Sequence, residues 1–174
     1  KPGDEIIITA MEHHSNIVPW HFLRERKGAV LKWLDIDDDG AIDLKALDAL
    51  IGPRTKLVAI THMSNVLGAK TPAAEIARIA HPKGVLVLFD GCQATVHGHV
   101  DVQEIDADFY AFTGHKLYGP TGIGVLYGRK ALLDAIEVES FGIYVASDVA
   151  GLRTFATGLI RANDRIGDVV TEWQ

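Results

Sequence analysis

Four short clusters of reactive side chains occur along this sequence, each directly after an apolar run. They are Glu12-His13-His14, Thr61-His62-Met63-Ser64-Asn65, Asp90-Gly91-Cys92-Gln93 and Thr113-Gly114-His115-Lys116. If the apolar runs are strands of an open α/β sheet, ligands bind in a crevice outside the carboxyl ends of those strands. The pattern therefore predicts one site that combines an imidazole, an amide, a carboxylate and an amine.

Lys116 has the most informative position of these residues. It stands between the end of an apolar run and a turn rich in Gly and Pro at residues 119–124, which would hold it at a fixed point. A Lys that is desolvated beside another cationic group has a lowered pKa and can form a Schiff base, as in pyridoxal phosphate enzymes. Taken alone, Lys116 could equally be an ordinary solvated loop lysine.

Asp90 ends the most hydrophobic run of the chain, Val85-Leu86-Val87-Leu88-Phe89. Burying a carboxylate there is costly unless the carboxylate meets a cation. A protonated pyridine nitrogen is such a cation, and keeping it protonated makes the ring an electron sink. The alternative is that Asp90 only caps the turn that follows it.

The elements that must position these residues alternate between strands and helices. We expect strands at 5–9, 29–34, 56–61, 85–89, 109–113 and 123–127, and helices at 17–27, 44–50, 73–80 and from about Arg129. This order is typical of βαβ units and a largely parallel sheet. In the first helix, Ser15 or Asn16 is the expected cap, Gly28 the end, and Ile17, Trp20, Phe22 and Leu23 the apolar face.

Composition narrows the class of protein. The 174 residues carry a net charge of −6 and 48% hydrophobic residues, without a cluster of Lys and Arg. We therefore expect one soluble α/β domain that binds neither nucleic acid nor a membrane. No apolar run approaches the roughly 20 residues needed to span a bilayer. Cys92 is the single cysteine, which excludes an internal disulfide and favours the reducing cytoplasm.

The four clusters together resemble one known family, the SufS-type cysteine desulfurases, which are fold-type-I pyridoxal phosphate enzymes of the class-V aminotransferase group. The likeness covers residues 3 to about 136, and the 26 positions from Asp90 to Lys116 also agree with the family. The resemblance implies a three-layer α/β/α fold with a mostly parallel sheet. It identifies 1–136 as a segment of the large cofactor-binding domain, truncated at both ends, and 137–174 as a divergent tail.

Three catalytic and cofactor-binding assignments follow from the resemblance. Lys116 resembles the lysine that holds pyridoxal phosphate as a Schiff base and then moves protons. Asp90 resembles the partner of the pyridine nitrogen. His13 resembles the imidazole that stacks on the cofactor ring and shuttles protons, which makes it the second catalytic candidate.

The resemblance also implies the remaining cofactor ligands and the reaction. Gln93 and Asn65 resemble side chains near the phenolic oxygen and the substrate, and Thr113 and His115 resemble phosphate ligands. The implied enzyme is a cytoplasmic homodimer that converts L-cysteine to L-alanine and an enzyme persulfide, whose sulfur goes to an acceptor protein for iron–sulfur cluster assembly. Alternatives are a selenocysteine lyase or another class-V aminotransferase and, from a different class, a non-catalytic interaction or remnant protein.

Two features depart from the family. No Cys follows Cys92, although the family's nucleophilic Cys lies far beyond the lysine, and Cys92 stands where the family usually has Ala. We therefore expect Cys92 to be a small buried filler and not the sulfur acceptor. The family's N-terminal part, with a helix N-terminus that binds the phosphate, is also absent, so we expect weaker phosphate affinity.

Metal binding is the weaker alternative chemistry. Asp35, Asp37 and Asp39-Gly40 approach a calcium loop, but Ala46 stands where a bidentate Glu is needed. His97 and His99 suggest a metal hydrolase, but no His pair beside a Glu has the helical spacing of zinc hydrolases. We expect no metal.

Overall fold

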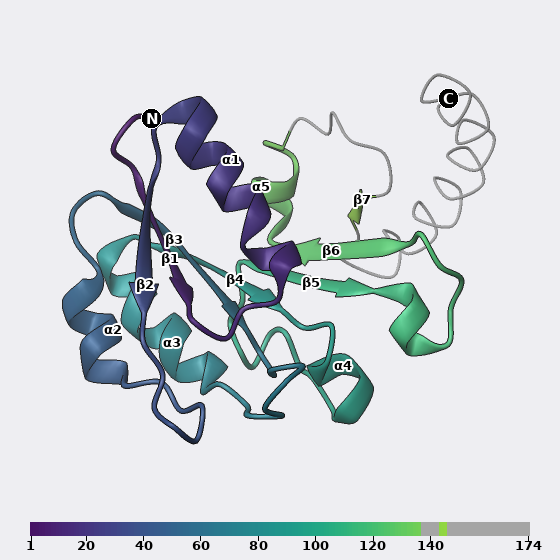
Figure 1. Cartoon of the computed structure of the whole chain (residues 1–174). Helices are drawn as coiled ribbons and strands as arrows, with labels where there is room; N and C mark the ends of the chain where they lie inside the picture. The colour runs from purple at the N-terminus through teal and green to yellow at the C-terminus, as the bar shows by residue number, and fades with distance from the viewer. Residues whose placement is uncertain (137–142, 146–174) are drawn as a thin grey trace.

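The structure is a computed structural model that describes residues 1–136 and 143–145. The described residues form a seven-stranded sheet with the order β2-β1-β3-β4-β5-β6-β7 (Figure 1). The strands are β1 (Glu5–Thr9), β2 (Val30–Leu34), β3 (Thr55–Thr61), β4 (Leu86–Asp90), β5 (Phe109–Thr113), β6 (Gly124–Gly128) and β7 (Ile143–Val145). Neighbouring strands run parallel except β5 and β6, which are antiparallel. The predicted, mostly parallel sheet is thus confirmed.

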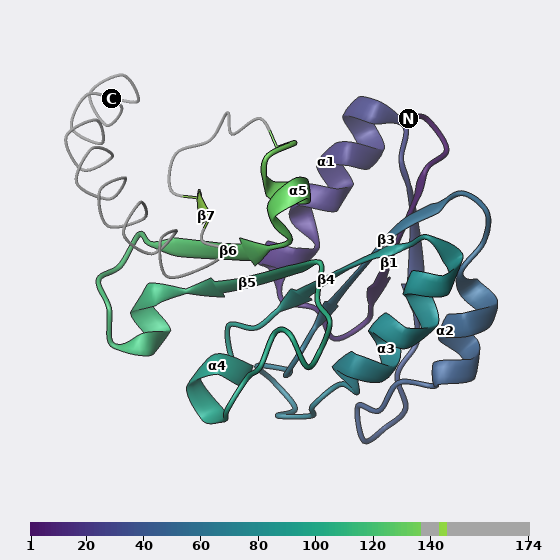
Figure 2. The same ribbon diagram turned by 180° about the vertical axis from the view of Figure 1, so that it is seen from behind.

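Helices cover both faces of this sheet. The helical segments are α1 (Val18–Lys27), α2 (Leu44–Leu50), α3 (Ala73–Ala80), α4 (Ala94–His97), α5 (Lys130–Leu133) and the short 3-10 turns η1 (His14–Asn16), η2 (His81–Lys83) and η3 (Gly114–Leu117). α2 and α3 lie on one face and α1 on the other, as Figures 1 and 2 show from opposite sides. The predicted α/β/α layering is therefore confirmed.

The two faces differ in how much core they bury. Ile7, Val58 and Phe89 pack with Leu47 of α2 and Ile76 of α3 in the larger cluster. The smaller cluster, under α1, contains Ile6, Ile8 and Ala59 with the partly buried Ile17 and Trp20. Successive strand residues alternate between the two clusters because their side chains point to opposite faces.

The first helix starts within one residue of its predicted position, but its predicted cap is wrong. Ser15 and Asn16 lie in η1, and α1 begins after Ile17 without a side-chain cap. The Asn16 amide is instead engaged elsewhere, since its Oδ1 accepts a hydrogen bond from Trp20 Nε1 at 3.0 Å. Gly28 does end α1, in the left-handed conformation at φ 71°, where a side chain would add strain.

The expected apolar face of α1 is only half right. Ile17 and Trp20 pack on the sheet, but Phe22 and Leu23 are 47% and 38% exposed. Phe22 instead lies under the guanidinium of Arg26, 4.8 Å from its ring centre. The expected divergent tail, 137–174, lies outside the described residues except for 143–145.

Within the described ranges, every helix is too short or too polar to cross a lipid bilayer.

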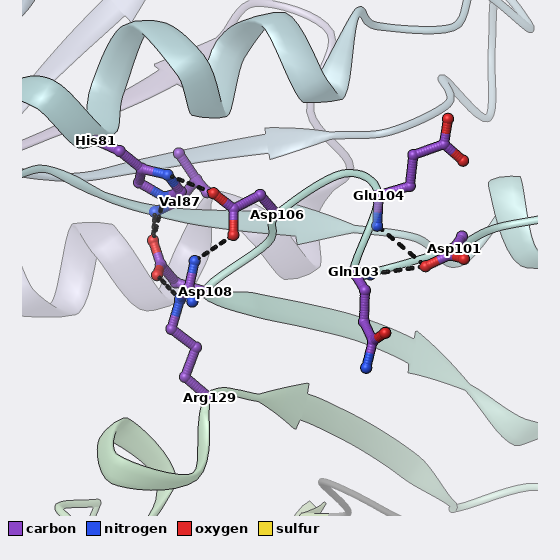
Figure 3. Close-up of polar contacts among 8 residues, drawn as sticks. All are labelled: His81, Val87, Asp101, Gln103, Glu104, Asp106, Asp108 and Arg129. Carbon is purple, nitrogen blue, oxygen red and sulfur yellow. Dashed lines mark hydrogen bonds and ion pairs between the residues drawn. The ribbon is translucent and has the colours of Figure 1, made fainter.

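The buried carboxylate of Asp108 links several elements at the amino ends of the strands, whereas the candidate site residues stand at the carboxyl ends (Figure 3). Asp108 is only 3% exposed and accepts hydrogen bonds from the Val87 amide at 2.8 Å and from Arg129 Nε at 2.6 Å. Its Oδ2 also lies 2.9 Å from Nε2 of His81. Asp108 therefore ties β4, η2 and the β6–α5 junction to the start of β5.

We expect Asp108→Asn to destabilise the fold by about 2 kcal/mol, because the amide cannot accept from all three donors and leaves the Arg129 guanidinium less well paired. Urea unfolding measures this loss. The control is Asp48→Asn, which breaks an exposed pair with Lys83 and should change stability by less than about 0.5 kcal/mol. Equal losses for the two variants would contradict the role given to Asp108.

Candidate active site

A cavity of about 320 Å³ opens at the carboxyl edge of the sheet. It is lined by His13, Ser15, Thr61, Met63, Asn65, Asp90, Cys92, Gln93, Thr113, His115 and Lys116. All the predicted site residues are therefore brought together. Of the other lining residues, Thr61, Met63 and Cys92 belong to the clusters that the sequence singled out but had no assigned role at the site, and Ser15 was expected only as a helix cap.

The register of the sheet explains this convergence. Thr61 at the end of β3 pairs with Asp90 at the end of β4, and Asp90 pairs with Ala111 of β5. Because these strands are parallel neighbours, the loops that follow them leave the sheet side by side. His13 arrives from the loop after β1, which neighbours β3.

Lys116 lies in η3, half-buried, with its side chain at the cavity. The turn after it is closed by a hydrogen bond of 2.9 Å from the Gly119 amide to the carbonyl of Gly114. A Cβ on Gly119 would stand 2.9 Å from that same oxygen, so a residue without a side chain is needed there. Among the described residues Lys116 forms no ion pair, so no carboxylate of these residues holds its side chain away from the cavity.

Asp90 is a buried carboxylate without a cationic protein partner in the described part of the chain. It is 8% exposed, and its Oδ1 accepts a hydrogen bond from the Cys92 amide at 3.0 Å. Asp90 thus does cap the following turn, as the alternative interpretation held. The group that binds Oδ1 in this turn is a backbone amide, which carries no charge. A buried, uncompensated carboxylate at a cavity wall fits a cationic ligand atom such as a protonated pyridine nitrogen.

His13 stands exposed at the cavity with its ring fixed on one side. Its Nδ1 accepts a hydrogen bond from the Ser15 amide at 3.2 Å and lies 2.9 Å from Ser15 Oγ. Since Nδ1 accepts, the neutral ring carries its proton on Nε2. The free Nε2–H is therefore the atom of His13 that can donate or exchange a proton.

Thr113 and His115 form a second polar pair. Thr113 Oγ1 lies 2.7 Å from His115 Nδ1 and 3.3 Å from the carbonyl oxygen of Ile123. The side-chain amides of Gln93 and Asn65 make no hydrogen bond within the described residues. The side-chain amides of Gln93 and Asn65 therefore provide unused donors at the cavity, which suits an anionic and hydroxylated ligand.

Tyr110 and His62 lie behind Asp90. The Tyr110 hydroxyl is 2.8 Å from His62 Nδ1. Burial, and then the charge of Asp90, raise the pKa of Tyr110, whereas burial and then Lys70 lower the pKa of His62. Both groups therefore remain neutral at neutral pH and leave the charge of Asp90 for a ligand.

Cys92 lines the cavity and is half-buried, so its description as a buried filler is wrong. Burial, followed by the charge of Asp90, raises the pKa of Cys92 to about 12. The thiol is therefore protonated at neutral pH, which agrees with the expectation that it is not a nucleophile.

We expect Cys92 to react about 30-fold more slowly with an aromatic disulfide reagent in the folded chain than in the urea-unfolded chain. A pKa raised from 9.0 to about 12 lowers the thiolate fraction on the order of 1,000-fold, and the higher nucleophilicity of that thiolate recovers part of the rate. The absorbance of the released thiol measures both rates, and Cys92→Ser supplies the blank. A folded chain that reacts as fast as the unfolded one would show that the thiol is activated.

The calcium-like run at residues 35–40 and the pair His97 and His99 form no metal site in the structure. Within the described ranges no group of three His, Cys, Asp or Glu side chains is arranged to hold a metal ion. The Asp37 carboxylate instead accepts hydrogen bonds from the amides of Asp39 at 3.0 Å and Ala41 at 2.7 Å. The calcium-like spacing is thus explained by turn formation.

Comparison with known proteins gives one consistent family. Residues 1–153 match the sequence model of the family described as aminotransferase class-V. A cysteine desulfurase of Dickeya dadantii is 57% identical over 136 residues, which is 78% of this chain and 33% of that protein. A cysteine desulfurase of Cronobacter sakazakii is 56% identical over 146 residues, 83% of this chain and 36% of that protein. The chain thus spans about a third of the length of these curated relatives.

Solved structures agree in fold. The cysteine desulfurase CsdA of Escherichia coli superposes with a TM-score of 0.76 at 38% identity, over 97% of this chain and 46% of that one. An apo cysteine desulfurase of Thermococcus onnurineus superposes with a TM-score of 0.75 at 40% identity. The match covers 86% of this chain and 37% of that one.

Proposed function

The chain belongs to the class-V aminotransferase family, and we propose that it carries the pyridoxal-phosphate-binding core of a cysteine desulfurase. One observation carries this proposal. The cavity that contains the half-buried Lys116 amine also presents the buried Asp90 carboxylate, which has no cationic partner among the described residues.

Different residues of the cavity would bind different groups of the cofactor. Lys116 would hold the cofactor covalently, and Asp90 would accept the proton of its ring nitrogen. Thr113 and His115 would donate to the phosphate, and Gln93 would donate to the phenolic oxygen. When bound, pyridoxal phosphate withdraws electrons from the α-carbon of an amino acid through its protonated ring.

Two side chains, those of His13 and Lys116, would transfer protons. His13 holds a proton on Nε2, because its Nδ1 accepts from the Ser15 amide. The Lys116 amine, once displaced by the amine of a substrate, is a base fixed by η3 at the cavity. Asn65, exposed on the loop between β3 and α3, would contact the substrate.

The proposed substrate is L-cysteine, and the relatives' names support this choice. Cys92 is the sole cysteine of the sequence and its thiol is protonated, so we propose that the sulfur-accepting thiol comes from outside these 174 residues. The proposal extends to a homodimer in the cytoplasm that supplies sulfur for iron–sulfur clusters. Its support is the family membership and the sparing use of cysteine.

Titration with pyridoxal phosphate, followed by amino acids, tests the proposed function. The chain should bind the cofactor with a new visible absorbance band, and L-cysteine should shift that band at concentrations at which L-alanine does not. A shift with L-selenocysteine alone would favour the selenocysteine lyase. Cooperative unfolding without any cofactor band would favour the non-catalytic alternative and contradict the proposal.

A further inference from the structure

Glu12 has a buried carboxylate that binds Thr61, one of the residues that line the cavity. It is 8% exposed and does not line the cavity, whereas its neighbour His13 does. Its Oε1 accepts hydrogen bonds from Thr9 Oγ1 at 2.5 Å and from the Thr61 amide at 2.9 Å. Its Oε2 accepts one from Asn16 Nδ2 at 2.6 Å.

These bonds connect segments that are far apart in the sequence. Thr9 ends β1 and Thr61 ends β3, while Asn16 ends η1. Asn16 Nδ2 also donates to the carbonyl of Ala59 in β3 at 3.2 Å. One carboxylate therefore fastens the loop that follows β1 to the neighbouring strand on both sides of His13.

His13 depends on this attachment because its own side chain has little other support. Its ring bonds only to Ser15 among the described residues, and Ser15 belongs to the same η1 turn. The turn itself is held by the bond of 2.8 Å from the Asn16 amide to the His13 carbonyl. If Glu12 releases Asn16, the turn and the imidazole keep only the bond of 3.2 Å from Asn16 Nδ2 to the Ala59 carbonyl as a link to β3.

We propose that Glu12 is a positioning residue that sets the place of the His13 imidazole at the cavity. This role requires a carboxylate because three donors converge on it, and a Gln would turn an NH₂ group toward one of them. Burial raises the pKa of Glu12, and the three hydrogen bonds oppose that rise, while the nearby charge of Asp90 adds to it. The inference rests on the proposed function only where cofactor binding is the readout.

The first test needs no cofactor. Amide hydrogen exchange of Asn16 and Ile17 should become at least about tenfold faster in Glu12→Gln, since removing a bond to a charged group costs about 1.5–3 kcal/mol of local stability. The matched control is Glu5→Gln. Glu5 is 7% exposed at the other end of β1 and binds Lys32 Nζ at 2.8 Å and Thr55 Oγ1 at 2.8 Å, so its loss should leave these amides unchanged.

The second test is a double-mutant cycle on pyridoxal phosphate affinity. We expect His13→Ala and Glu12→Gln each to weaken binding about tenfold, and the double variant also about tenfold, since two residues that act as one unit are not additive. Glu5→Gln should leave the affinity unchanged, alone or with His13→Ala. If Glu12→Gln does not fold, Asn16→Ala replaces it in both tests.

The outcomes separate the inference from the proposed function. Losses that multiply to about 100-fold in the double variant would mean independent action and overturn the role of Glu12. Exchange at Asn16 and Ile17 that is equal in the Glu12 and Glu5 variants would overturn it as well. If the unmodified chain binds no cofactor but exchange responds to Glu12 alone, the proposed function fails and the positioning role stands.

Discussion

Asp90→Asn should weaken the binding of pyridoxal phosphate about 100-fold. The Asn side chain has nearly the same volume as the Asp side chain. Its oxygen can still accept the hydrogen bond that the Cys92 backbone amide donates to Oδ1 of Asp90 at 3.0 Å. What it lacks is the charge that faces the ligand, and a hydrogen bond to a charged group contributes about 1.5–3 kcal/mol. Absorbance titration measures the two dissociation constants.

A surface carboxylate gives the control for this substitution. Asp38 is exposed on the turn between β2 and α2, and Asp38→Asn changes the net charge by the same amount. We expect the affinity for pyridoxal phosphate to stay within about twofold of the unmodified chain, because the charge of an exposed side chain is screened by salt. If Asp38→Asn and Asp90→Asn weaken binding equally, Asp90 is not the partner of the ring nitrogen.

Gly91→Ala should destabilise the fold by at least about 3 kcal/mol, because it overpacks a site that cannot relax. An added Cβ would overlap the ring atoms Cε1 and Cζ of Tyr110. Tyr110 cannot move aside easily, since it is 1% exposed and its hydroxyl is held by His62 at 2.8 Å. Urea unfolding of the cofactor-free chain measures the loss.

Gly98→Ala is the matched control for this clash. Gly98 lies just after α4 in extended backbone, and its Cβ would approach only the mobile end of Lys70, at 3.2 Å. We expect a change within about 0.5 kcal/mol, as for most surface substitutions. A similar small change for Gly91→Ala would mean that Tyr110 does not occupy the space beneath the site.

Most of the sheet could be predicted because its strands are short, continuous apolar runs. The stretch Glu5–Thr9 is buried at every position, and its three consecutive Ile residues indicate burial on both faces. Helix α2 has the predicted bounds, with Leu47 buried and Asp43 as its cap. The antiparallel pairing of β6 with β5 was not predicted, although residues 114–123 are too short a connection for the crossover that a parallel pair would need.

The candidate site could be predicted as far as residues stand at strand ends. Lys116, Asp90 and Thr113 were recognised because the edge of a parallel sheet gathers such residues. Glu12 was named in the first cluster but was given no role, because its function depends on the amide of Thr61, 49 positions away. The expected cap on α1 failed for the same reason, since Asn16 bonds across to β3. Local preference at these positions is overruled by tertiary contacts.

The central claim is that Lys116 holds pyridoxal phosphate at this cavity. Borohydride reduction of the cofactor-loaded chain, followed by peptide mass mapping, tests it most directly. The proposed structure predicts one permanent cofactor adduct, on Lys116, that is lost in Lys116→Arg while the fold is kept. An adduct on other lysines such as Lys70 or Lys130, or no adduct on Lys116 in a chain that has bound the cofactor, would contradict it.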